Sequence, residues 1–205
     1  MADDSQISTS LSINFKIKIL YKNNKQEMHL LFSVMDLTVR YATNNDATLI
    51  ADISRQTFYE TFAPENRKED MDKFLSEQFA RGKLIMEVAN MENIFLLAYS
   101  GDVVAGYAKL REAIQPKKLQ NVKTLEIARI YAMTSMIGKG VGHLLMQTSI
   151  FIAKEKGKEI IWLGVWEKNI RAIDFYKKWG FEKFDVKDFL LGDDLQCDWL
   201  MKKEL

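Results

Sequence analysis

The segment "IGKGVG", Ile137 to Gly142, places three glycines on alternate positions around one lysine. It follows a strand-like stretch, residues 124–133, and leads into a helix-like stretch that begins near Gly140. The first amides of a helix have no acceptors within the helix, and the helix dipole is positive at that end. Glycine permits positive φ and lets a bulky anion reach the amides, while Lys139 adds charge. We therefore expect a phosphate or pyrophosphate here; a tight turn that needs glycine only for its geometry is the alternative.

Two common nucleotide motifs fit this segment poorly. A nucleotide P-loop needs Ser or Thr directly after its lysine, but Gly140 follows Lys139. A dinucleotide fingerprint needs a third glycine where His143 stands, although Glu167 supplies a later acid. Too little chain follows for a full doubly wound sheet. A dinucleotide-binding domain therefore stays only as a weak alternative.

The rest of the chain alternates strand and helix patterns. Apolar spacing predicts strands over residues 37–42, 93–100, 103–112, 124–133, 160–165, 181–191 and 197–205. It predicts helices over residues 44–62, 68–82, from about 140 to 157, and 169–180. Asn45 or Asp46 would cap the first helix and Asn169 the last, and Gly101-Asp102 would form a hairpin turn. The predicted order, β-α-α-β-β-β-α-β-α-β-β, defines a mixed α+β fold.

Residues 1–34 differ in pattern from the rest of the chain. "INFKIKIL", residues 13–20, alternates like a strand, but the next residues, "YKNNKQE", break the pattern. Met35 begins the clean strand-then-helix order and is a candidate original start, which mass spectrometry of the natively expressed protein would test. We expect an N-terminal extension of unknown role over residues 1–34 and one domain over residues 35–205.

Composition excludes several functional classes. The chain has 205 residues, of which 47% are hydrophobic, and a net charge of +1. Nucleic-acid binders usually carry a basic excess, so we expect no nucleic-acid partner. One cysteine, Cys197, cannot form an internal disulfide, and no apolar run is long enough to span a bilayer. We expect a cytoplasmic protein with no membrane partner, and no metal site, because the only histidines, His29 and His143, lie far apart.

Two stretches carry a family resemblance: "IARIYAMTSMIGKGVGHLLM", residues 127–146, and "WLGVWEKNIRAIDFYKKWGF", residues 162–181. They resemble the GNAT superfamily of acetyl-CoA-dependent N-acetyltransferases, and the element order extends the resemblance over residues 35–205. Of the signature Q/R-x-x-G-x-G/A, Gly140 and Gly142 match. Ile137 stands where Gln or Arg is usual, which weakens the pyrophosphate anchor, and Lys139 would compensate.

The resemblance implies a three-layer α/β/α sandwich. Its central sheet is mixed and mostly antiparallel, with a splayed pair of strands that holds CoA. "QTFYETFAPEN", residues 56–66, and the tail from Phe189 to Leu205 are further similar to the bacterial PaiA-type polyamine acetyltransferases. The implied cosubstrate is acetyl-CoA, and the implied acceptor is a small-molecule primary amine, such as spermidine or spermine.

The resemblance also assigns cofactor-binding residues. The backbone of Ile130, Tyr131 and Ala132 would pair with the pantetheine arm of CoA in the gap between the splayed strands. Asn169 would bond the same arm, and Phe175 would line its channel. The amides that would hold the pyrophosphate are those of Ile137, Gly138, Lys139, Gly140, Val141 and Gly142.

Two residues are candidates for proton transfer. An alkylamine has a pKa of about 10 and must lose a proton before it attacks, so a base is needed. Glu126, on the splayed strand, is the candidate base; an ion pair with Arg129 or Arg111 on an exposed face is the alternative. Tyr176 lies where the family places the acid that protonates the departing thiolate; an amphipathic core residue beside Ile173 is the alternative. A backbone N–H near Tyr131 would stabilise the oxyanion.

The acceptor site is expected between the first two helices and the later hairpin. Phe58, Tyr59 and Phe62 fall in that region and would contact the substrate. Carboxylates with aromatic faces suit a polyamine, and these would come from Glu60, Glu65, Asp193 and Asp194, unless they are simply solvated surface acids. Cys197, with no histidine nearby in sequence, is expected to be a packed side chain rather than a nucleophile.

We therefore interpret the chain as an N-acetyltransferase that transfers acetyl directly, within a ternary complex. The first alternative is a protein N-terminal or lysine acetyltransferase of the same fold. The second is a non-catalytic CoA-binding regulatory module. Family analogy also leads us to expect a homodimer formed through the last strands.

Overall fold

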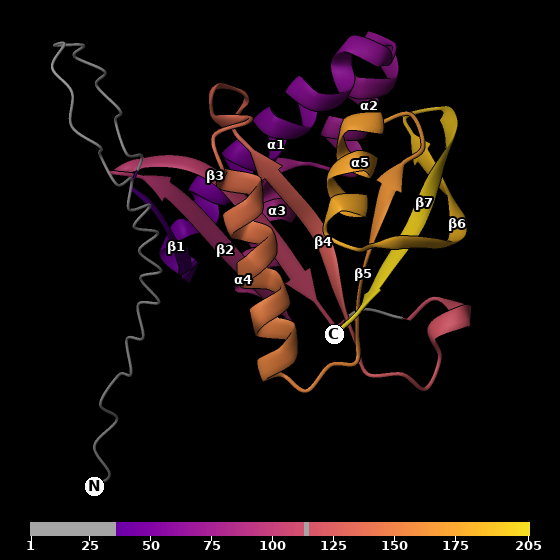
Figure 1. Cartoon of the computed structure of the whole chain (residues 1–205). Helices are drawn as coiled ribbons and strands as arrows, with labels where there is room; N and C mark the ends of the chain where they lie inside the picture. The colour runs from indigo at the N-terminus through magenta and orange to yellow at the C-terminus, as the bar shows by residue number, and fades with distance from the viewer. Residues whose placement is uncertain (1–35, 113–114) are drawn as a thin grey trace, which may run out of the picture.

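The computed structural model describes residues 36–112 and 115–205 (Figure 1). The strand expected at residues 13–20 and the candidate start at Met35 lie outside these residues. The strands are β1 (Leu37–Tyr41), β2 (Asn93–Ser100), β3 (Val103–Arg111), β4 (Thr124–Ala132), β5 (Ile160–Trp166), β6 (Glu182–Leu191) and β7 (Asp194–Glu204). The helices are α1 (Ala47–Phe62), α2 (Lys68–Glu77), α3 (Arg81–Ala89), α4 (Val141–Glu155) and α5 (Ile170–Lys178).

The strands form one seven-stranded sheet in the order β1-β2-β3-β4-β5-β7-β6. Only β4 and β5 pair in parallel; the other neighbours are antiparallel. The prediction of a mixed, mostly antiparallel α+β sheet is confirmed. The dinucleotide alternative, which needs a doubly wound parallel sheet, is wrong because the topology lacks one.

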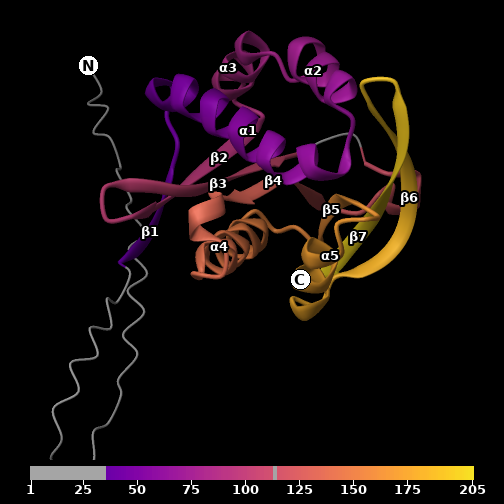
Figure 2. The same ribbon diagram turned by 90° about the horizontal axis from the view of Figure 1, so that it is seen from above.

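Helices cover both faces of the sheet. Figure 2 shows α1, α2 and α3 on one face and α4 and α5 on the other. One core lies between the sheet and α4 and α5, and it contains Leu145, Met146, Leu163 and Met201. On the opposite face, apolar side chains of α1 pack on β2 and β3, and a phenylalanine-rich cluster joins α1, α2 and α3. The sheet is therefore the middle layer of the predicted α/β/α sandwich.

Several local predictions are confirmed. Gly140 precedes α4 with φ of +89°, and Gly157 and Gly180 follow α4 and α5 with φ of +62° and +81°. Asn169 caps α5, because its side-chain oxygen accepts from the backbone N–H of Ala172 at 3.2 Å. Gly101 adopts φ of +57° in the β2–β3 turn, as a tight hairpin requires.

The helix predicted over residues 68–82 is wrong. The structure has two helices here, α2 and α3, because Ala80 is extended (φ −60°, ψ 137°) and breaks the chain direction. Gly82 does not end a helix; it lies in the first turn of α3, which the sequence pattern missed. The last strand also begins earlier than predicted, at Asp194 rather than Cys197, because Gly192 at φ of +64° makes a tight β6–β7 turn.

Candidate active site

The parallel strands β4 and β5 separate partway along their length. Their pairing runs from Thr124 with Ile160 to Ile127 with Leu163 and then stops, although both strands continue. At the same point the register between β3 and β4 shifts, so that Ala128 is an extra residue. From Ala128 to Ala132, the edge of β4 that faces β5 has no strand partner. This opening exposes backbone donors and acceptors in the middle of the sheet.

A cleft of about 1350 Å³ extends from this opening. Its wall includes most of the predicted cofactor residues: Ile130, Tyr131, Ala132, Ile137, Gly138, Gly140, Gly142, Asn169 and Phe175. It also includes Glu126 and Tyr176, the two predicted proton-transfer residues. Two predicted cofactor residues are not in the wall: Lys139 lies in the turn before α4, and Val141 is buried in the core.

The glycine loop leaves only part of its amides available, because the N–H groups of Ile137 and Lys139 already donate to the carbonyls of Thr134 and Met136, at 3.3 and 3.2 Å. Gly138 and Gly140 both have positive φ, +78° and +89°, which any other residue would adopt only with strain. The first helical bond of α4 runs from the N–H of Leu144 to the carbonyl of Gly140, so the amides before Leu144 have no acceptor within the helix. Gly142 faces α5, and a Cβ there would lie 3.7 Å from the ring of Phe175. Backbone amides, a helix N-terminus and space for a ligand therefore coincide at this end of the cleft, a combination that suits an anion.

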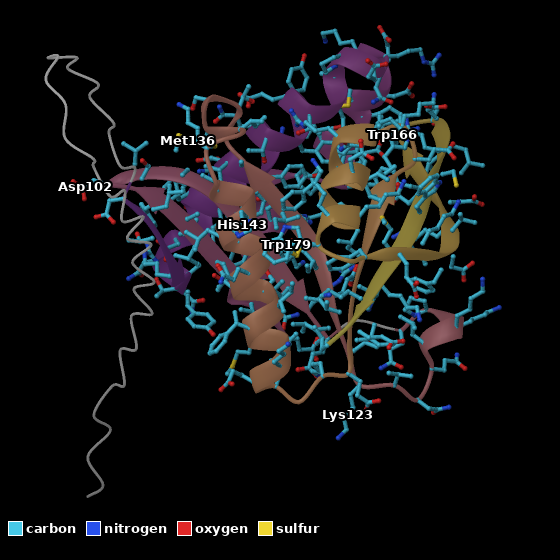
Figure 3. All side chains as sticks on the ribbon, in the orientation of Figure 1. Asp102, Lys123, Met136, His143, Trp166 and Trp179 are labelled. Atoms are coloured by element: carbon cyan, nitrogen blue, oxygen red, sulfur yellow. The ribbon has the colours of Figure 1, made fainter. Side chains whose placement is uncertain are left out.

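Aromatic rings line the gap between α4 and α5. His143 on α4 and Trp179 just after α5 face one another, with ring centroids 4.6 Å apart (Figure 3). Phe175 packs edge-on against Tyr176, at 5.6 Å. The contact between His143 and Trp179 holds the end of α5 against α4.

Tyr176 is buried on α5 in the main core, with only 7% of its surface exposed. Burial raises the pKa of its hydroxyl above the usual value, and no described residue forms a hydrogen bond with this hydroxyl. The phenol therefore stays protonated at neutral pH. Both predicted roles are compatible with this position: Tyr176 is a core residue, and it also reaches the wall of the cleft.

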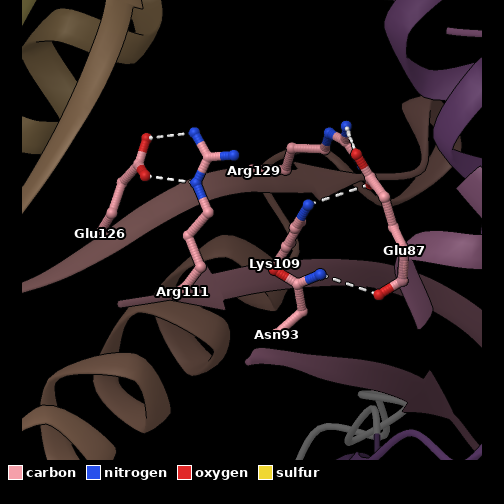
Figure 4. Close-up of polar contacts among 6 residues, drawn as sticks. All are labelled: Glu87, Asn93, Lys109, Arg111, Glu126 and Arg129. Atoms are coloured by element: carbon pink, nitrogen blue, oxygen red, sulfur yellow. Dashed lines mark hydrogen bonds and ion pairs between the residues drawn. The ribbon is translucent and has the colours of Figure 1, made fainter. Parts of the chain in front are cut away.

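Glu126 is 4% exposed, and Arg111 holds it in a bidentate ion pair. The Nε of Arg111 donates to Oε2 at 2.5 Å, and Nη2 donates to Oε1 at 3.1 Å (Figure 4). The pairing with Arg111 that the sequence offered as an alternative is therefore present, but in the cleft wall rather than on an exposed face. Both carboxylate oxygens accept a hydrogen bond from this one guanidinium.

A second charged group extends the same wall. Glu87 accepts from Arg129 at 2.6 and 3.2 Å and lies 3.1 Å from the ammonium of Lys109 (Figure 4). The guanidinium of Arg129 also covers the ring of Phe79 at 4.5 Å. Lys109 is only 2% exposed, and burial lowers its pKa. The sequence analysis missed this group because Glu87 lies in the helix that it did not predict.

On the α1 side, two of the three predicted substrate residues line the cleft. Phe58 and Phe62 do so, and Phe62 packs edge-on against Trp166 at 5.9 Å. Tyr59 does not: it points outward from α1 and is 42% exposed. Of the predicted acids, Glu60 and Glu65 line the cleft, whereas Asp193 in the β6–β7 turn and Asp194 at the start of β7 lie outside the lining.

Asp198 on β7 is a further cleft residue that the sequence analysis did not single out. Within residues 36–112 and 115–205, no group of three or more His, Cys, Asp or Glu side chains is arranged to hold a metal ion. No helix in the described part of the chain is long and apolar enough to cross a membrane. Cys197 is half-buried, and burial raises the pKa of its thiol, which disfavours the nucleophilic thiolate.

Comparison with known proteins identifies the family. Residues 55–181 match the acetyltransferase (GNAT) family, and the chain therefore belongs to it. The chain is 39% identical over 153 residues to an uncharacterized N-acetyltransferase in the pepI 3' region of Lactobacillus delbrueckii subsp. lactis, covering 75% of this chain and 88% of that protein. The protein is thus an N-acetyltransferase.

Two further similarities involve Thermoplasma acidophilum. The chain is 25% identical over 163 residues to its spermidine N(1)-acetyltransferase, covering 77% of this chain and 96% of that one. The crystal structure of its PaiA N-acetyltransferase in complex with coenzyme A superposes with a TM-score of 0.68 at 23% identity, covering 83% of this chain and 100% of that one. This second similarity supports the fold.

Proposed function

We propose that the protein transfers the acetyl group of acetyl-CoA to the primary amine of a small molecule, and that the acceptor is a polyamine such as spermidine or spermine. One observation carries the proposal: the opening between β4 and β5 lies beside the buried phenol of Tyr176 and beside the amides of Gly138 and Gly140, which form no backbone hydrogen bond within the described residues. The site therefore offers backbone partners for the thioester arm of acetyl-CoA, amides for its diphosphate, and Tyr176 as a proton donor.

The residues of the opening fit CoA. The amides around Gly138 and Gly140 would bind the pyrophosphate at the start of α4. The unpaired backbone of Ile130–Ala132 would bond the pantetheine arm as an added strand would. The oxygen of Asn169 is used by the α5 cap, so its side-chain NH₂ is the group left for the arm. The cosubstrate supplies an acetyl group already activated as a thioester.

The acceptor enters as an ammonium ion and must lose a proton before its nitrogen can bond to the acetyl carbon. We propose that Glu126 takes this proton, and a bridging water would serve because Arg111 occupies both of its oxygens. The carbon–sulfur bond breaks as the carbon–nitrogen bond is completed, and Tyr176 donates its proton to the departing thiolate. The acylated nitrogen gives up its second proton, which returns to Tyr176, and Glu126 releases its proton to solvent, so the cycle closes.

The acceptor is proposed to lie between α1 and the opening. Phe58, Phe62 and Trp166 offer apolar and aromatic surface, and Glu60 and Glu65 add negative charge at the same side of the cleft. Carboxylates beside aromatic faces favour a flexible alkylammonium. The spermidine acetyltransferase from Thermoplasma acidophilum, 25% identical, agrees with this class.

One observation favours a second acceptor class. On the wall between β3, β4 and α3, three cations (Lys109, Arg111 and Arg129) face two carboxylates (Glu87 and Glu126), which leaves one positive charge in excess. Such a wall would attract an acceptor that carries a carboxylate as well as an amine, as a peptide does. A peptide or protein amine is therefore the alternative acceptor.

Thiol release from acetyl-CoA separates these classes. The assay compares spermidine, spermine, a short diamine, a lysine peptide and a peptide with a free N-terminus, and product mass spectrometry identifies the acetylated nitrogen. A kcat/KM highest for polyamines supports the proposal, and a kcat/KM highest for the peptides supports the alternative. Glu126→Gln, measured with the best acceptor, should lower kcat by about 100-fold or more if Glu126 accepts the proton.

A further inference from the structure

Asp198 presents its carboxylate to open space in the cleft. It lies on β7, with Trp166 of β5 and Lys187 of β6 as its direct cross-strand neighbours. Residues directly opposite in a sheet share a face, so all three side chains lie on one face of the sheet. Gly164 of β5 has no side chain, and a Cβ there would be 3.6 Å from Oδ2 of Asp198. The space that a side chain at residue 164 would fill therefore lies against this carboxylate.

Within residues 36–112 and 115–205, this carboxylate has no ion-pair partner. Among the residues that the structure describes, none places a cationic nitrogen within 4.0 Å of the Asp198 carboxylate, and none donates a hydrogen bond to that carboxylate. By contrast, Glu126 in the cleft wall is paired with Arg111, and Glu87 beside the wall is paired with Arg129. Burial raises the pKa of Asp198, and the charge of Lys187 opposes the shift only in part. A half-buried carboxylate without a partner is unfavourable unless a cation reaches it from outside the chain.

Asp198 is also close to the proposed reaction centre. Tyr131, Tyr176 and Asp198 all line the same cleft. Asp198 therefore faces the same cleft as the strand that supplies the proposed oxyanion donor and as the proposed acid. Trp166 of β5 lies between Asp198 and β4 in the sheet, and its ring has the ammonium of Lys168 over it at 5.6 Å.

We propose that Asp198 binds the ammonium group of the acceptor, with the ring of Trp166 beside it, at the mouth of the β4–β5 opening. This inference rests on the proposed function. Asp198 makes the ion pair that brings the reacting nitrogen to the cleft, while Glu126 takes its proton and Tyr176 protonates the thiolate. The empty position at Gly164 provides room for the alkylamine. The acceptor is thus recognised through its positive charge, and the preferred class is a primary alkylammonium.

The test is Asp198→Asn, which keeps the shape of the side chain and removes its charge. The matched control is Asp188→Asn, because Asp188 is an exposed residue on the neighbouring strand β6 that lies outside the cleft lining. In steady-state assays with spermidine, Asp198→Asn should raise KM for the amine roughly 10- to 100-fold, the loss expected when one partner of a partly buried ion pair is removed. Its KM for acetyl-CoA should stay within about twofold of wild type, and Asp188→Asn should behave as wild type in both.

Three further results keep the test decisive. Thermal unfolding and calorimetric titration with CoA must show that Asp198→Asn folds and binds CoA as wild type does. A second variant, Asp198→Glu, restores the charge and should recover part of the affinity for spermidine. An unchanged amine KM in Asp198→Asn, with an active wild type, overturns this inference and leaves the proposed function intact. A wild type that releases thiol with no amine overturns the proposed function itself.

Discussion

Arg111 on β3 donates to both carboxylate oxygens of Glu126 on β4, at 2.5 and 3.1 Å. The carboxylate is almost fully buried, whereas 41% of the Arg111 side chain is exposed. One partner therefore reaches solvent while the other cannot. The pair fixes Glu126 in the cleft wall next to the point where β4 leaves β5.

The first prediction concerns the stability of this pair. Arg111→Met leaves the Glu126 carboxylate buried without a cation, and the free energy of unfolding should fall by about 2 kcal/mol. In the Arg111→Met background, Glu126→Gln should lower the free energy of unfolding by less than it does in wild type. The reason is that it removes a buried carboxylate that has already lost its cation. Denaturant unfolding of the four proteins measures this coupling. If the losses of unfolding free energy in the two single variants add up to the loss in the double variant, the two residues do not stabilise one another.

Tyr176→Phe tests the proposed acid. No described residue bonds the hydroxyl, so its removal should change the free energy of unfolding by less than about 0.5 kcal/mol. With the thiolate no longer protonated, kcat should fall by about 100-fold or more, while KM for acetyl-CoA changes little. Tyr131→Phe is the matched control, because only the backbone of Tyr131 is assigned a role; its kcat should stay within a few-fold of wild type. Wild-type turnover by Tyr176→Phe would remove this residue from the mechanism.

The glycine loop gives a third prediction. Gly140→Ala forces a Cβ into a backbone with φ of +89°, at a cost of about 1–2 kcal/mol, and should also weaken CoA binding because the loop amides must move. Gly157→Ala, at φ of +62° beyond the far end of α4, should cost similar stability and leave CoA binding unchanged. In Gly142→Ala the new Cβ contacts only the Phe175 ring, at an ordinary 3.7 Å. Of the three variants, it should therefore lower the free energy of unfolding least. Equal CoA affinity in Gly140→Ala and Gly157→Ala would argue against the loop as the pyrophosphate site.

The fourth prediction is a pH dependence at the start of α1. Arg40 donates two 2.8 Å bonds to Asp46 and lowers the pKa of that carboxyl to about 2. Because the folded pKa lies below the unfolded one, the stabilisation is present above about pH 4 and is lost as the pH falls toward 2. Arg40 is 42% exposed, so solvent screening reduces the effect to about 1 kcal/mol.

Asp46→Asn should therefore lower the free energy of unfolding by about 1 kcal/mol at pH 7, and the difference from wild type should vanish near pH 2. Denaturant titrations at several pH values measure it. Asp102→Asn, which changes an exposed turn carboxylate, is the control and should cost little at pH 7. A difference from wild type that persists at pH 2 would mean that Asp46 acts through something other than its charge.

The sequence predicted the elements whose ends carry strong local signals. Gly140, Gly157 and Gly180 have the positive φ that only glycine adopts without strain, so their pattern was readable without tertiary information. Gly82 misled the prediction because its backbone is ordinary and nothing lies within 4 Å of its Cβ position. The break between α2 and α3 comes instead at Ala80, just after carbonyls of Leu75 and Phe79 that accept hydrogen bonds from Arg55 of α1.

The site was predictable where it depends on local sequence and unpredictable where it depends on pairing. The loop amides were predicted from one short glycine pattern, and Tyr176 from a second stretch, residues 162–181, that carries the family resemblance. The bidentate hold of Arg111 on Glu126 follows from the β3–β4 register, and the openness around Asp198 follows from the β5–β7 register. Neither register is encoded in a short segment. Tyr59 and Phe62 lie three residues apart on α1, yet only Phe62 faces the cleft.

The most direct test of the proposed mechanism is an initial-rate study in which acetyl-CoA and spermidine are both varied. Direct transfer across the β4–β5 opening requires both substrates on the enzyme together, so the double-reciprocal lines should intersect, and no acetylated protein should be found without amine. Parallel lines, with acetyl on the protein in the absence of spermidine, would contradict this mechanism and indicate a covalent intermediate. Thiol release that no amine accelerates would contradict it as well.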